Sequence, residues 1–510
     1  MSSSTNSLPP NTPILIGGGQ VQQRDADPAS ALDPVALMAE AAGLAAADAG
    51  SDARLLAGLD KIAVVNIIGW HYSNAPRLLA ERVGAKPAQE IYTTVGGNTP
   101  QWLVNHTADE IAAGKTRFAL IAGAEAIESV ANARKQGVHL DWPKDGEGKA
   151  TVIGDQRHGS SDSEMMHGLV LPSAVYPLFE NALRAHYGWS IEEHRRRLGI
   201  LCSRMTKVAA ANPNAWFQIE RSPEEITTAA PDNRMVAFPY TKYMNAIMNV
   251  DQSAAVLMTS VQAAREMGIP ESRWIFLHGG AEATDLWFPT ERANFHSSPA
   301  IARAGREALA QAGRSIDEID LFDIYSCFPI AVEIGRDMLG IAHDDPRDLT
   351  VTGGLPYHGG PGNNYVTHSI AQMIRRLRDG DGKLGLVTGL GWYITKHSVG
   401  IYGTEPAPWA AGGWSRPDPK TYQAEIDRMP HPEVRTSASG PATIETYTVL
   451  FDRDGTPTRG IVVARLPDGA RVISNTQNDR EVLEGLLAGE AIGRPGKVET
   501  SAAGNVFAPS

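Results

Sequence analysis

The sequence contains little cysteine and no long apolar run, and both shortages limit the class of protein. Cys202 and Cys327 are the only cysteines among 510 residues, which excludes a framework of several disulfides and favours a reducing compartment. No apolar stretch approaches the length needed to span a bilayer, and the opening residues lack the basic start and apolar core of a signal peptide. We therefore expect a cytoplasmic protein that does not enter a membrane.

Common nucleotide and metal motifs are missing as well. The sequence has no GxxxxGK[ST] loop, no HExxH and no paired CxxC, so we expect neither P-loop chemistry nor a metal site. The net charge of −12 argues against a partner that is recognised through its phosphate backbone, which excludes nucleic acid as the expected ligand. The composition is otherwise that of an ordinary globular enzyme, and the length predicts two to four domains.

One order of caps, strands and glycine turns occurs twice along the chain at a nearly constant spacing. Asp33-Pro34 and Ser298-Pro299 each begin a predicted helix, and these helices end at Gly50 and Gly313. Predicted strands follow at 59–66 and 118–126 in the first copy, and at 319–326 and 385–392 in the second. Helices that alternate with short apolar strands predict α/β layers with buried, mostly parallel sheets, arranged as two similar halves.

A glycine-rich loop precedes a predicted helix in each copy. The first loop reads VGGN at 95–98, and the second reads GGLPYHGGPGNN at 353–364. Because the two loops occupy equivalent places in the repeat, we expect them to lie at equivalent points of the fold. Loops at such points often carry catalytic side chains, whereas both of these present glycine.

The remaining composition predicts the domain boundaries. Residues 1–12 are expected to form a disordered tail, 13–268 a first half, 269–403 a second half and 404–440 a linker rich in proline, glycine and tryptophan. An insertion at 126–238 within the first half is expected to cover a site. The final segment, 441–510, has short alternating strands separated by DRDG and PDG turns, which predicts a small β domain of the OB type.

These features resemble the thiolase superfamily, most closely its sterol-carrier-protein-like and thiolase-like branches. The resemblance covers roughly residues 10–403 and depends on PILIGGG at 13–19, the loop 95–102, YSCF at 325–328 and GGLPYHGGPG at 353–362. It implies a duplicated, layered α-β-α-β-α fold with an inserted loop domain. The C-terminal β domain resembles the OB domain of small partner proteins that some thiolase-like enzymes recruit.

Thiolases make or break a carbon–carbon bond next to an acyl-CoA thioester, and the resemblance implies where their catalytic groups would be. The nucleophilic cysteine falls at Gly96 or one residue either side, the GHP histidine at Gly360, and the last motif in 386–391, which ends at Gly391. None of these positions holds cysteine or histidine. An acyl-cysteine is therefore not expected, although Gly96, Gly97, Gly360 and Gly391 are expected to present backbone N–H groups to an oxyanion.

Four side chains are candidates to replace the missing catalytic groups. Tyr325 takes the place of a substrate-facing Asn or His, and a tyrosine of lowered pKa would act as a base; the alternative is a core aromatic. Cys327 is a candidate nucleophile, although a buried, inert cysteine is the favoured interpretation. His358 and His397 are candidates that compete with a solvated loop histidine and a strand-end histidine, respectively. Arg234 and Lys242 are the candidates for binding CoA phosphates, against the alternative of a solvated surface.

Three functional hypotheses follow from the resemblance. The first is a thiolase-like protein of lipid metabolism that binds acyl-CoA and is nominally an acetyl-CoA acyltransferase. The second is a retro-aldol lyase that acts on a β-hydroxyacyl-CoA, and the third is a CoA-binding scaffold without catalysis. Coenzyme A would be part of the substrate, no covalently bound cofactor is expected, and the resemblance leaves a homodimer open.

Overall fold

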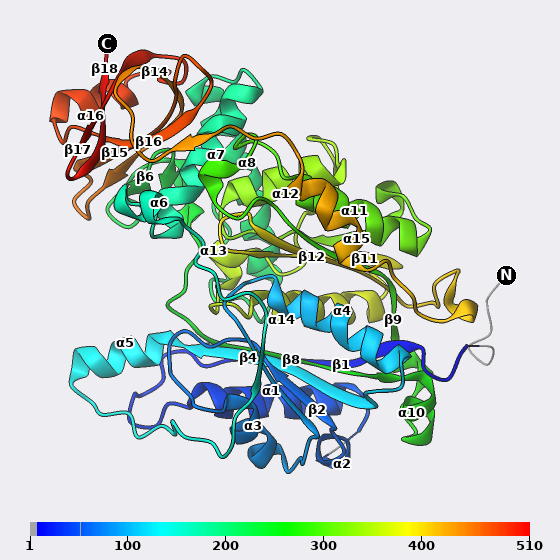
Figure 1. Cartoon of the computed structure of the whole chain (residues 1–510). Coiled ribbons are helices and arrows are strands. Elements are labelled where there is room, and N and C mark those ends of the chain that lie inside the picture. Colours follow the sequence, from blue (N-terminus) through cyan, green and yellow to red (C-terminus); the bar gives the residue numbers. More distant parts are fainter. Residues whose placement is uncertain (1–7, 52) are drawn as a thin grey trace.

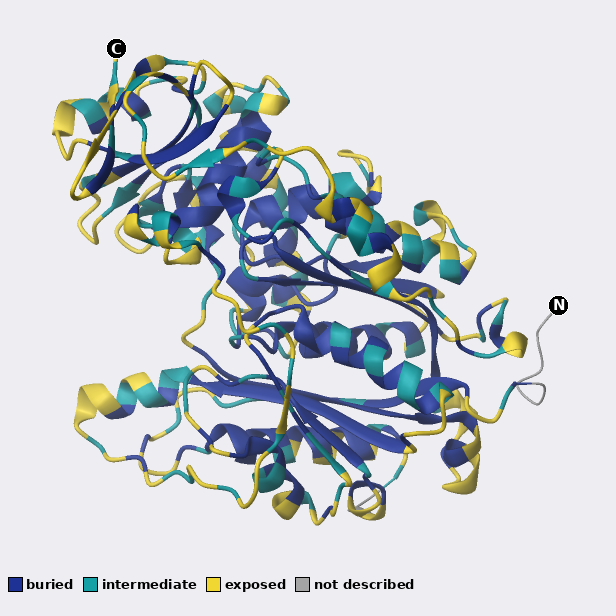
Figure 2. Ribbon diagram, viewed as in Figure 1, coloured by how far each residue is buried: buried dark blue, intermediate teal, exposed yellow. Residues whose placement is uncertain are grey.

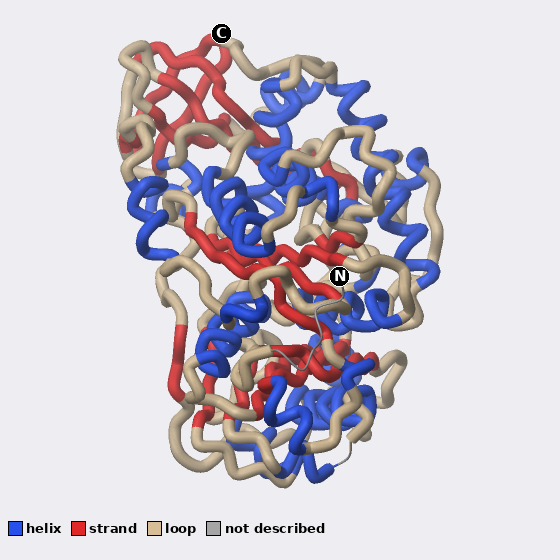
Figure 3. Tube along the Cα trace, turned by 90° about the vertical axis from the view of Figure 1, so that its right-hand side faces the viewer, coloured by secondary structure: helices blue, strands red, loops and turns tan. Residues whose placement is uncertain are grey.

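The body of the protein consists of two sheet layers with helices between and outside them (Figures 1 and 3). The structure is a computed structural model that describes residues 8–51 and 53–510. The strands of the body pair in the order β10-β11-β12-β9-β1-β8-β4-β2-β3-β5. The first half supplies β1–β5 and β8, the second half supplies β9–β12, and the two layers are joined where Ile14 and Leu15 of β1 pair with β9.

Both sheet layers are mixed, which corrects the expectation of mostly parallel sheets. In the first layer β2, β3, β4 and β5 run parallel, whereas β8 pairs antiparallel with β4 and β1. In the second layer only β10 and β11 are parallel. The strands are β1 (Pro13–Gln22), β2 (Lys61–Val64), β3 (Gln89–Thr93), β4 (Phe118–Ala126), β5 (Thr151–Ile153), β8 (Asp251–Ser260), β9 (Ile275–Thr284), β10 (Leu321–Asp323), β11 (Leu384–Gly391) and β12 (Lys396–Gly403).

The helices occupy three layers, and their caps repeat between the halves. The central layer holds α4 (Thr99–Ala112) and α14 (Tyr365–Arg378), which follow the two glycine loops. The outer layers hold α1 (Pro34–Asp48), α2 (Ala53–Ala57), α3 (Ala75–Val83) and α10 (Val261–Glu266) on one side, and α11 (Pro299–Ala312) and α12 (Pro329–Leu339) on the other. The Asp33 carboxylate caps α1, and the Ser298 hydroxyl caps α11, as the proline-marked starts predicted. Figure 2 shows that the long strands of the two sheet layers are buried and that the central helices are buried or partly buried.

Consecutive glycines allow the first strand to lie close to helices on both of its faces. An added Cβ at Gly17 or Gly19 would collide with carbonyl oxygens of α1, and one at Gly18 would lie 3.0 Å from the Ala371 Cβ of α14. Any side chain at these positions would push the layers apart. The PILIGGG segment is therefore a packing feature of the duplicated fold.

Most of the insertion forms a helical domain against which a closed β-barrel packs, whereas α5 (Ile127–Gln136) lies beside the first sheet layer (Figure 1). The helices of this domain are α6 (Asp162–Met166), α7 (Pro172–His186), α8 (Ile191–Ala211) and α9 (Pro223–Thr227), followed by strands β6 (Met235–Ala237) and β7 (Tyr240–Thr241). The barrel strands are β14 (Gly440–Phe451), β15 (Pro457–Arg465), β16 (Arg471–Thr476), β17 (Pro495–Ser501) and β18 (Gly504–Pro509), with α16 (Arg480–Leu487) after β16. The barrel ring closes in the order β14-β15-β16-β18-β17, and β6 pairs with β14 from outside.

Two terminal connections are more ordered than the sequence predicted. Residues 1–7 of the expected tail lie outside the described residues, but Leu8 is buried, and the carbonyls of Pro10 and Thr12 accept N–H groups from Gln262 and Val261. The expected linker contains α15 (Pro419–Asp427) and β13 (Val434–Arg435). The Tyr422 hydroxyl of α15 donates to the carbonyl of Glu282 on β9, so this part of the linker packs on the second half. Among the described residues, no helix is both long and apolar enough to cross a bilayer.

Candidate active site

The two glycine loops meet at the boundary between the halves, where the N-termini of α4 and α14 approach each other. The Gly96 N–H donates to the Asn363 side-chain oxygen over 2.8 Å, and the Asn363 amide donates to the carbonyl of Asn66 over 3.0 Å. Asn363 therefore joins the second loop to the first. The Asn363 and Asn364 side chains both reach across the interface, and neither makes a side-chain cap of α14.

The space beside the first glycine loop is occupied by other side chains. An added Cβ at Gly97 would collide with the Tyr325 hydroxyl and lie 2.6 Å from the Leu390 carbonyl oxygen. An added Cβ at Gly96 would lie 2.7 Å from the Lys396 Nζ. The space that a side chain at Gly96 or Gly97 would fill is thus occupied. The Lys396 amine and the Tyr325 phenol, both from the second half, fill it.

Lys396 is a buried amine with few partners. It begins β12, retains 7% exposure, and donates from Nζ to the carbonyl oxygen of Val95. Burial lowers the pKa of this amine to about 8, with Asp155 acting in the opposite direction. Sequence reasoning chose the neighbouring His397 and missed Lys396. The only available signal was a lysine that opens an otherwise buried strand.

The turn that leads to Lys396 has an unusual backbone. Trp392 and Ile394 both have φ of +56°, in the left-handed region that side-chain-bearing residues seldom adopt. Gly391, which ends β11, has no room for a side chain, because an added Cβ would collide with the Asn98 side-chain oxygen. Strained backbone of this kind is concentrated at functional sites, where the surrounding structure imposes it.

Unpaired backbone donors lie at the start of α4. Within residues 8–51 and 53–510, the N–H groups of Gly97 and Asn98 have no hydrogen-bond acceptor, and the buried Asn98 side-chain oxygen also lacks a partner. The two N–H groups precede a helix of 14 residues, whose N-terminus carries a partial positive charge. Together with Lys396 they form a region that favours negatively charged oxygen. The oxyanion role of the glycine loops stays a prediction, and these donors are the geometry that supports it.

Tyr325 and Cys327 both lie in the core, just after β10. Burial raises the pKa of the Tyr325 phenol well above 10, so its hydroxyl is a hydrogen-bond donor at neutral pH and not a base. Burial also raises the pKa of the Cys327 thiol to about 12, with the Tyr176 side chain as its neighbour. Cys202 in α8 has a similarly raised pKa of about 12. Neither thiol is a thiolate at neutral pH, which is the form required of a nucleophile.

His358 is fully buried at the end of α13 (Leu355–His358). Burial lowers its pKa to about 4, so the imidazole is neutral, and its Nε2 has no partner among the described residues. The Tyr365 ring lies 5.8 Å from His358 and 5.7 Å from Tyr325, between centroids, so Tyr365 separates the two candidates. Gly360 donates its N–H to the Ile247 carbonyl over 2.8 Å, and an added Cβ there would meet no atom closer than 3.3 Å.

The remaining predicted residues point elsewhere. His397 follows Lys396 on β12, so its side chain lies on the opposite face of the sheet, where its Nε2 is 3.3 Å from Asp285 Oδ2 and 3.5 Å from the Ser298 hydroxyl. Arg234 and Lys242 flank the β6–β7 hairpin beside the barrel. The Arg234 guanidinium donates to the adjacent Met235 carbonyl, and Lys242 is exposed. The structure thus brings Tyr325 to the glycine loop but not these three side chains.

A carboxylate that the sequence did not reveal lies beside the second loop. Glu125, at the end of β4, accepts the N–H groups of Ile68 and Gly69 over 2.7 Å and 2.8 Å. An added Cβ at Gly362 would collide with Glu125, which places this carboxylate against the loop. Desolvation by burial raises its pKa to about 7 despite those two hydrogen bonds.

One group of potential metal ligands occurs among the described residues, away from the glycine loops. Glu180, His194 and Glu333 come from α7, α8 and α12 and place one ligand atom each within 4.8 Å of the others. The Glu180 carboxylate already accepts the Tyr240 hydroxyl over 2.6 Å and contacts His194 Nε2 at 2.7 Å. These bonds describe a hydrogen-bonded core cluster.

Comparison with known proteins identifies the architecture. A monomeric SCP2-thiolase-like protein type 1 from Mycobacterium smegmatis is 36% identical, covers 99% of this chain and 100% of its own, and superposes with a TM-score of 0.85. The chain belongs to the SCP2-thiolase-like protein type 1 family. Residues 421–502 also match the family described as the thiolase-like protein type 1 additional C-terminal domain. The thiolase superfamily fold and the C-terminal barrel are therefore shown.

More distant relatives share parts of the chain. An acetyl-CoA acetyltransferase from Methanothermobacter thermautotrophicus is 23% identical over 235 residues, which is 43% of this chain and 58% of the relative. A probable acetyl-CoA acetyltransferase from Dictyostelium discoideum is 27% identical over 142 residues, 28% of this chain and 31% of the relative. The matches thus span less than two thirds of either curated relative.

A solved structure of an Ltp2–ChsH2(DUF35) aldolase resembles this SCP2-thiolase-like protein in fold. It has a TM-score of 0.59 at 19% identity and covers 77% of this chain and 98% of its own. At this identity the likeness shows a common fold. Both acyltransferases and an aldolase therefore occur among proteins related to this chain in sequence or fold.

Proposed function

We propose that this SCP2-thiolase-like protein binds acyl-CoA thioesters where α4 meets α14, without forming an acyl-cysteine. The observation that carries the proposal is the packing at Gly97. A cysteine Cβ at that position would collide with the Tyr325 hydroxyl and lie 2.6 Å from the Leu390 carbonyl. Atoms of the second half therefore leave no room for a catalytic cysteine at this position. One of them, the Leu390 carbonyl oxygen, belongs to the backbone and cannot turn away.

Binding of a thioester is supported by the donors that remain. The N–H groups of Gly97 and Asn98 have no acceptor among the described residues, and the Lys396 Nζ would lie 2.7 Å from a Cβ at the adjacent Gly96, so these donors gather at the start of α4. Donors fixed in a site of low dielectric stabilise a thioester oxygen or an enolate strongly. Coenzyme A enters this proposal as part of the ligand, which agrees with the names of the two acetyltransferase relatives.

Calorimetry and a thiolysis assay on one preparation test the proposal. Acetoacetyl-CoA should bind with a measurable heat, and adding free CoA should give no acetyl-CoA above the rate without protein. The Cys202→Ala, Cys327→Ala double variant should bind equally well. Thiolysis that disappears in the double variant would contradict the absence of an acyl-cysteine, and a lack of binding to every CoA thioester would contradict the site.

A second candidate is a carbon–carbon lyase that cleaves a β-hydroxyacyl-CoA by a retro-aldol reaction. Lys396 favours it, because an amine with a pKa near 8 is suited to remove a proton from a β-hydroxyl, and the Tyr325 hydroxyl would donate to the developing enolate. The fold shared with an Ltp2–ChsH2(DUF35) aldolase makes this reaction class relevant. The base role that the sequence gave to Tyr325 passes to Lys396 in this proposal.

Incubation with a branched β-hydroxyacyl-CoA separates the candidates. A lyase releases a ketone and a shortened acyl-CoA, and Tyr325→Phe should reduce that rate while binding persists. Binding without either product would leave the CoA-binding scaffold as the function.

We also propose that the barrel is of the OB type, because its strand order places the third and fifth strands parallel, with α16 between the third and fourth.

A further inference from the structure

The Lys396 amine stands in the position from which a thiolase-like nucleophile would act. Its Nζ would lie 2.7 Å from a Cβ at Gly96, which is one of the positions where the superfamily's cysteine is expected. Lys396 belongs to β12, on the other side of the boundary between the halves. The turn before it, which contains the left-handed residues Trp392 and Ile394, positions its side chain. A nucleophile is thus placed at the first glycine loop by the second half.

The amine is buried but lies close to the protein surface. Asp155 is the charged neighbour, and the Arg157 guanidinium bonds Asp155 over 2.7 Å, so that carboxylate is already paired. The Trp287 ring lies 5.9 Å from Nζ. Val95, whose carbonyl accepts the amine, is 37% exposed, and the neighbouring Asp155 is also partly exposed.

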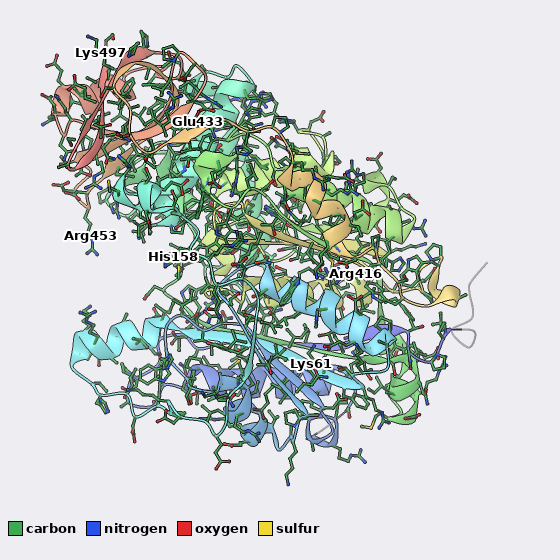
Figure 4. The ribbon with its side chains drawn as sticks, viewed as in Figure 1. Lys61, His158, Arg416, Glu433, Arg453 and Lys497 are labelled. Atoms are coloured by element: carbon green, nitrogen blue, oxygen red, sulfur yellow. The ribbon has the colours of Figure 1, made fainter. Side chains whose placement is uncertain are left out.

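A thin segment covers this region. Residues 154–158 of the insertion are exposed or partly exposed, and Gly159 rests on the Trp392 ring. His158 lies at the narrow waist between the barrel-bearing part and the first half (Figure 4), and its carbonyl accepts the Trp287 indole N–H over 2.6 Å. Asp155, the charged neighbour of the amine, therefore belongs to a segment that is exposed or partly exposed.

We propose that Lys396 is an amine nucleophile that forms an imine with the ketone carbon of a β-ketoacyl thioester. This inference rests on the proposed function, because the thioester must first bind at the start of α4. Desolvation is a general means of activating lysine for this chemistry, since it favours the neutral amine. No other lysine side chain among the described residues hydrogen-bonds to either glycine loop.

The proposed step balances without an additional reagent. The Nζ lone pair attacks the ketone carbon, the carbonyl π electrons move to oxygen, and proton transfer gives a carbinolamine. Loss of that oxygen as water forms the C=N bond, so the net change is amine plus ketone to imine plus water. The Tyr325 hydroxyl and the free N–H groups of Gly97 and Asn98 would donate to the carbonyl oxygen as it gains charge.

Reductive trapping tests the inference directly. The full-length protein is incubated with acetoacetyl-CoA and cyanoborohydride, digested, and analysed by mass spectrometry. We expect one modified peptide, whose mass corresponds to the thioester attached to Lys396 with loss of water and gain of two hydrogens. Labelling should increase as the pH rises through about 8, since the neutral amine is the reacting form.

Matched controls separate this inference from the proposed function. Acetyl-CoA has no ketone and should give no borohydride-dependent product, and Lys207→Arg, an exposed lysine of α8, should label like the unchanged protein. Lys396→Arg keeps the positive charge but should lose the label entirely. If calorimetry shows that acetoacetyl-CoA binds while no label reaches Lys396, the imine is wrong and the proposed function stands. If neither binding nor label is found, both are wrong.

Discussion

At the scale of single residues, the site differs from a thiolase by more than the loss of cysteine and histidine. Gly97 is pressed against Tyr325 and Leu390, and Gly96 against Lys396. By contrast, an added Cβ at Gly360 would meet no atom closer than the Leu355 Cδ2 at 3.3 Å, which is the end of a flexible side chain. The position predicted for the cysteine is thus filled by side chains from the other half, whereas the position predicted for the histidine is only tightly packed.

Restoring the cysteine at the first loop is therefore expected to fail. Gly97→Cys should give no thiolysis and should lower the free energy of unfolding by ~1–3 kcal/mol, because the Leu390 carbonyl cannot move away without shifting a strand. Chemical denaturation measures the loss. Gly43→Ala is the control: an added Cβ there meets nothing within 4 Å, and an exposed helical glycine replaced by alanine should gain up to about 1 kcal/mol. A stable, thiolytic Gly97→Cys variant would refute the packing argument.

Glu125 predicts a pH dependence of stability. Its pKa in the folded state is about 7, above the ordinary value of 4.5, so the native state binds more protons than the unfolded chain between these values. The unfolding free energy contributed by this group therefore falls as pH rises through that window, by about 3 kcal/mol at most. Glu125→Gln removes the titration, so denaturation at about pH 5 and pH 8 should show a flatter profile than the unchanged protein. Parallel profiles would disprove the raised pKa.

The sequence predicted some of the residues that line the candidate site and missed others. The loop glycines and Tyr325 could be predicted because motif order and repeat spacing place them. Lys396 and Glu125 could not, because their importance comes from long-range burial and from a turn with left-handed residues. His397 illustrates the limit: one residue along a strand reverses the face, so a candidate in the correct segment pointed away from the site.

At the scale of elements, the duplicated caps are the features that the sequence predicted best. Asp33 and Ser298 cap equivalent helices, and β4 and β11 lie where strands were expected. The short strands β5, β6 and β7 were missed, since two or three residues carry no periodic pattern. The sheets were expected to be mostly parallel, but the order of elements does not reveal that β8 and β12 return antiparallel.

The cap of α11 gives a prediction at this scale. The Ser298 hydroxyl accepts the Ile301 N–H over 3.1 Å and also donates to the buried Asp285 carboxylate. Ser298→Ala should therefore cost ~2–3 kcal/mol, because a helix cap and a partner of a buried charge are lost together. Ser190→Ala is the matched comparison: this exposed cap of α8 accepts the Glu193 N–H over 3.1 Å, and its loss should cost ~1 kcal/mol. Equal losses in urea denaturation would contradict the Asp285 contribution.

At the scale of the whole molecule, the barrel is attached to the rest of the protein by strand pairing, an ion pair and hydrogen bonds. Strand β6 of the insertion pairs with β14, and the buried Arg184 of α7 forms an ion pair with Glu490 after α16. The Arg471 guanidinium of β16 donates to the carbonyls of Thr290 and Arg292 in the second half. These contacts hold the C-terminal domain against both the insertion and the second half, which agrees with a family in which the two occur in one chain.

The edge strand of the first sheet layer bears on the oligomeric state. This strand is β5, which pairs with β3 and has only three residues, and short edge strands discourage pairing between chains. We therefore predict a monomer of 54.7 kDa in solution. Light scattering after gel filtration at micromolar protein measures the mass. A stable dimer would mean that β5 does not block this edge.

Intact-mass spectrometry after incubation with acetyl-CoA is the decisive measurement of whether this thiolase fold forms an acyl-cysteine. We expect an unchanged protein mass, because the Cys202 and Cys327 thiols are buried with pKa values of about 12 and the loop position has no room for a thiol. A gain of one acetyl group that hydroxylamine removes and that maps to either cysteine would contradict it.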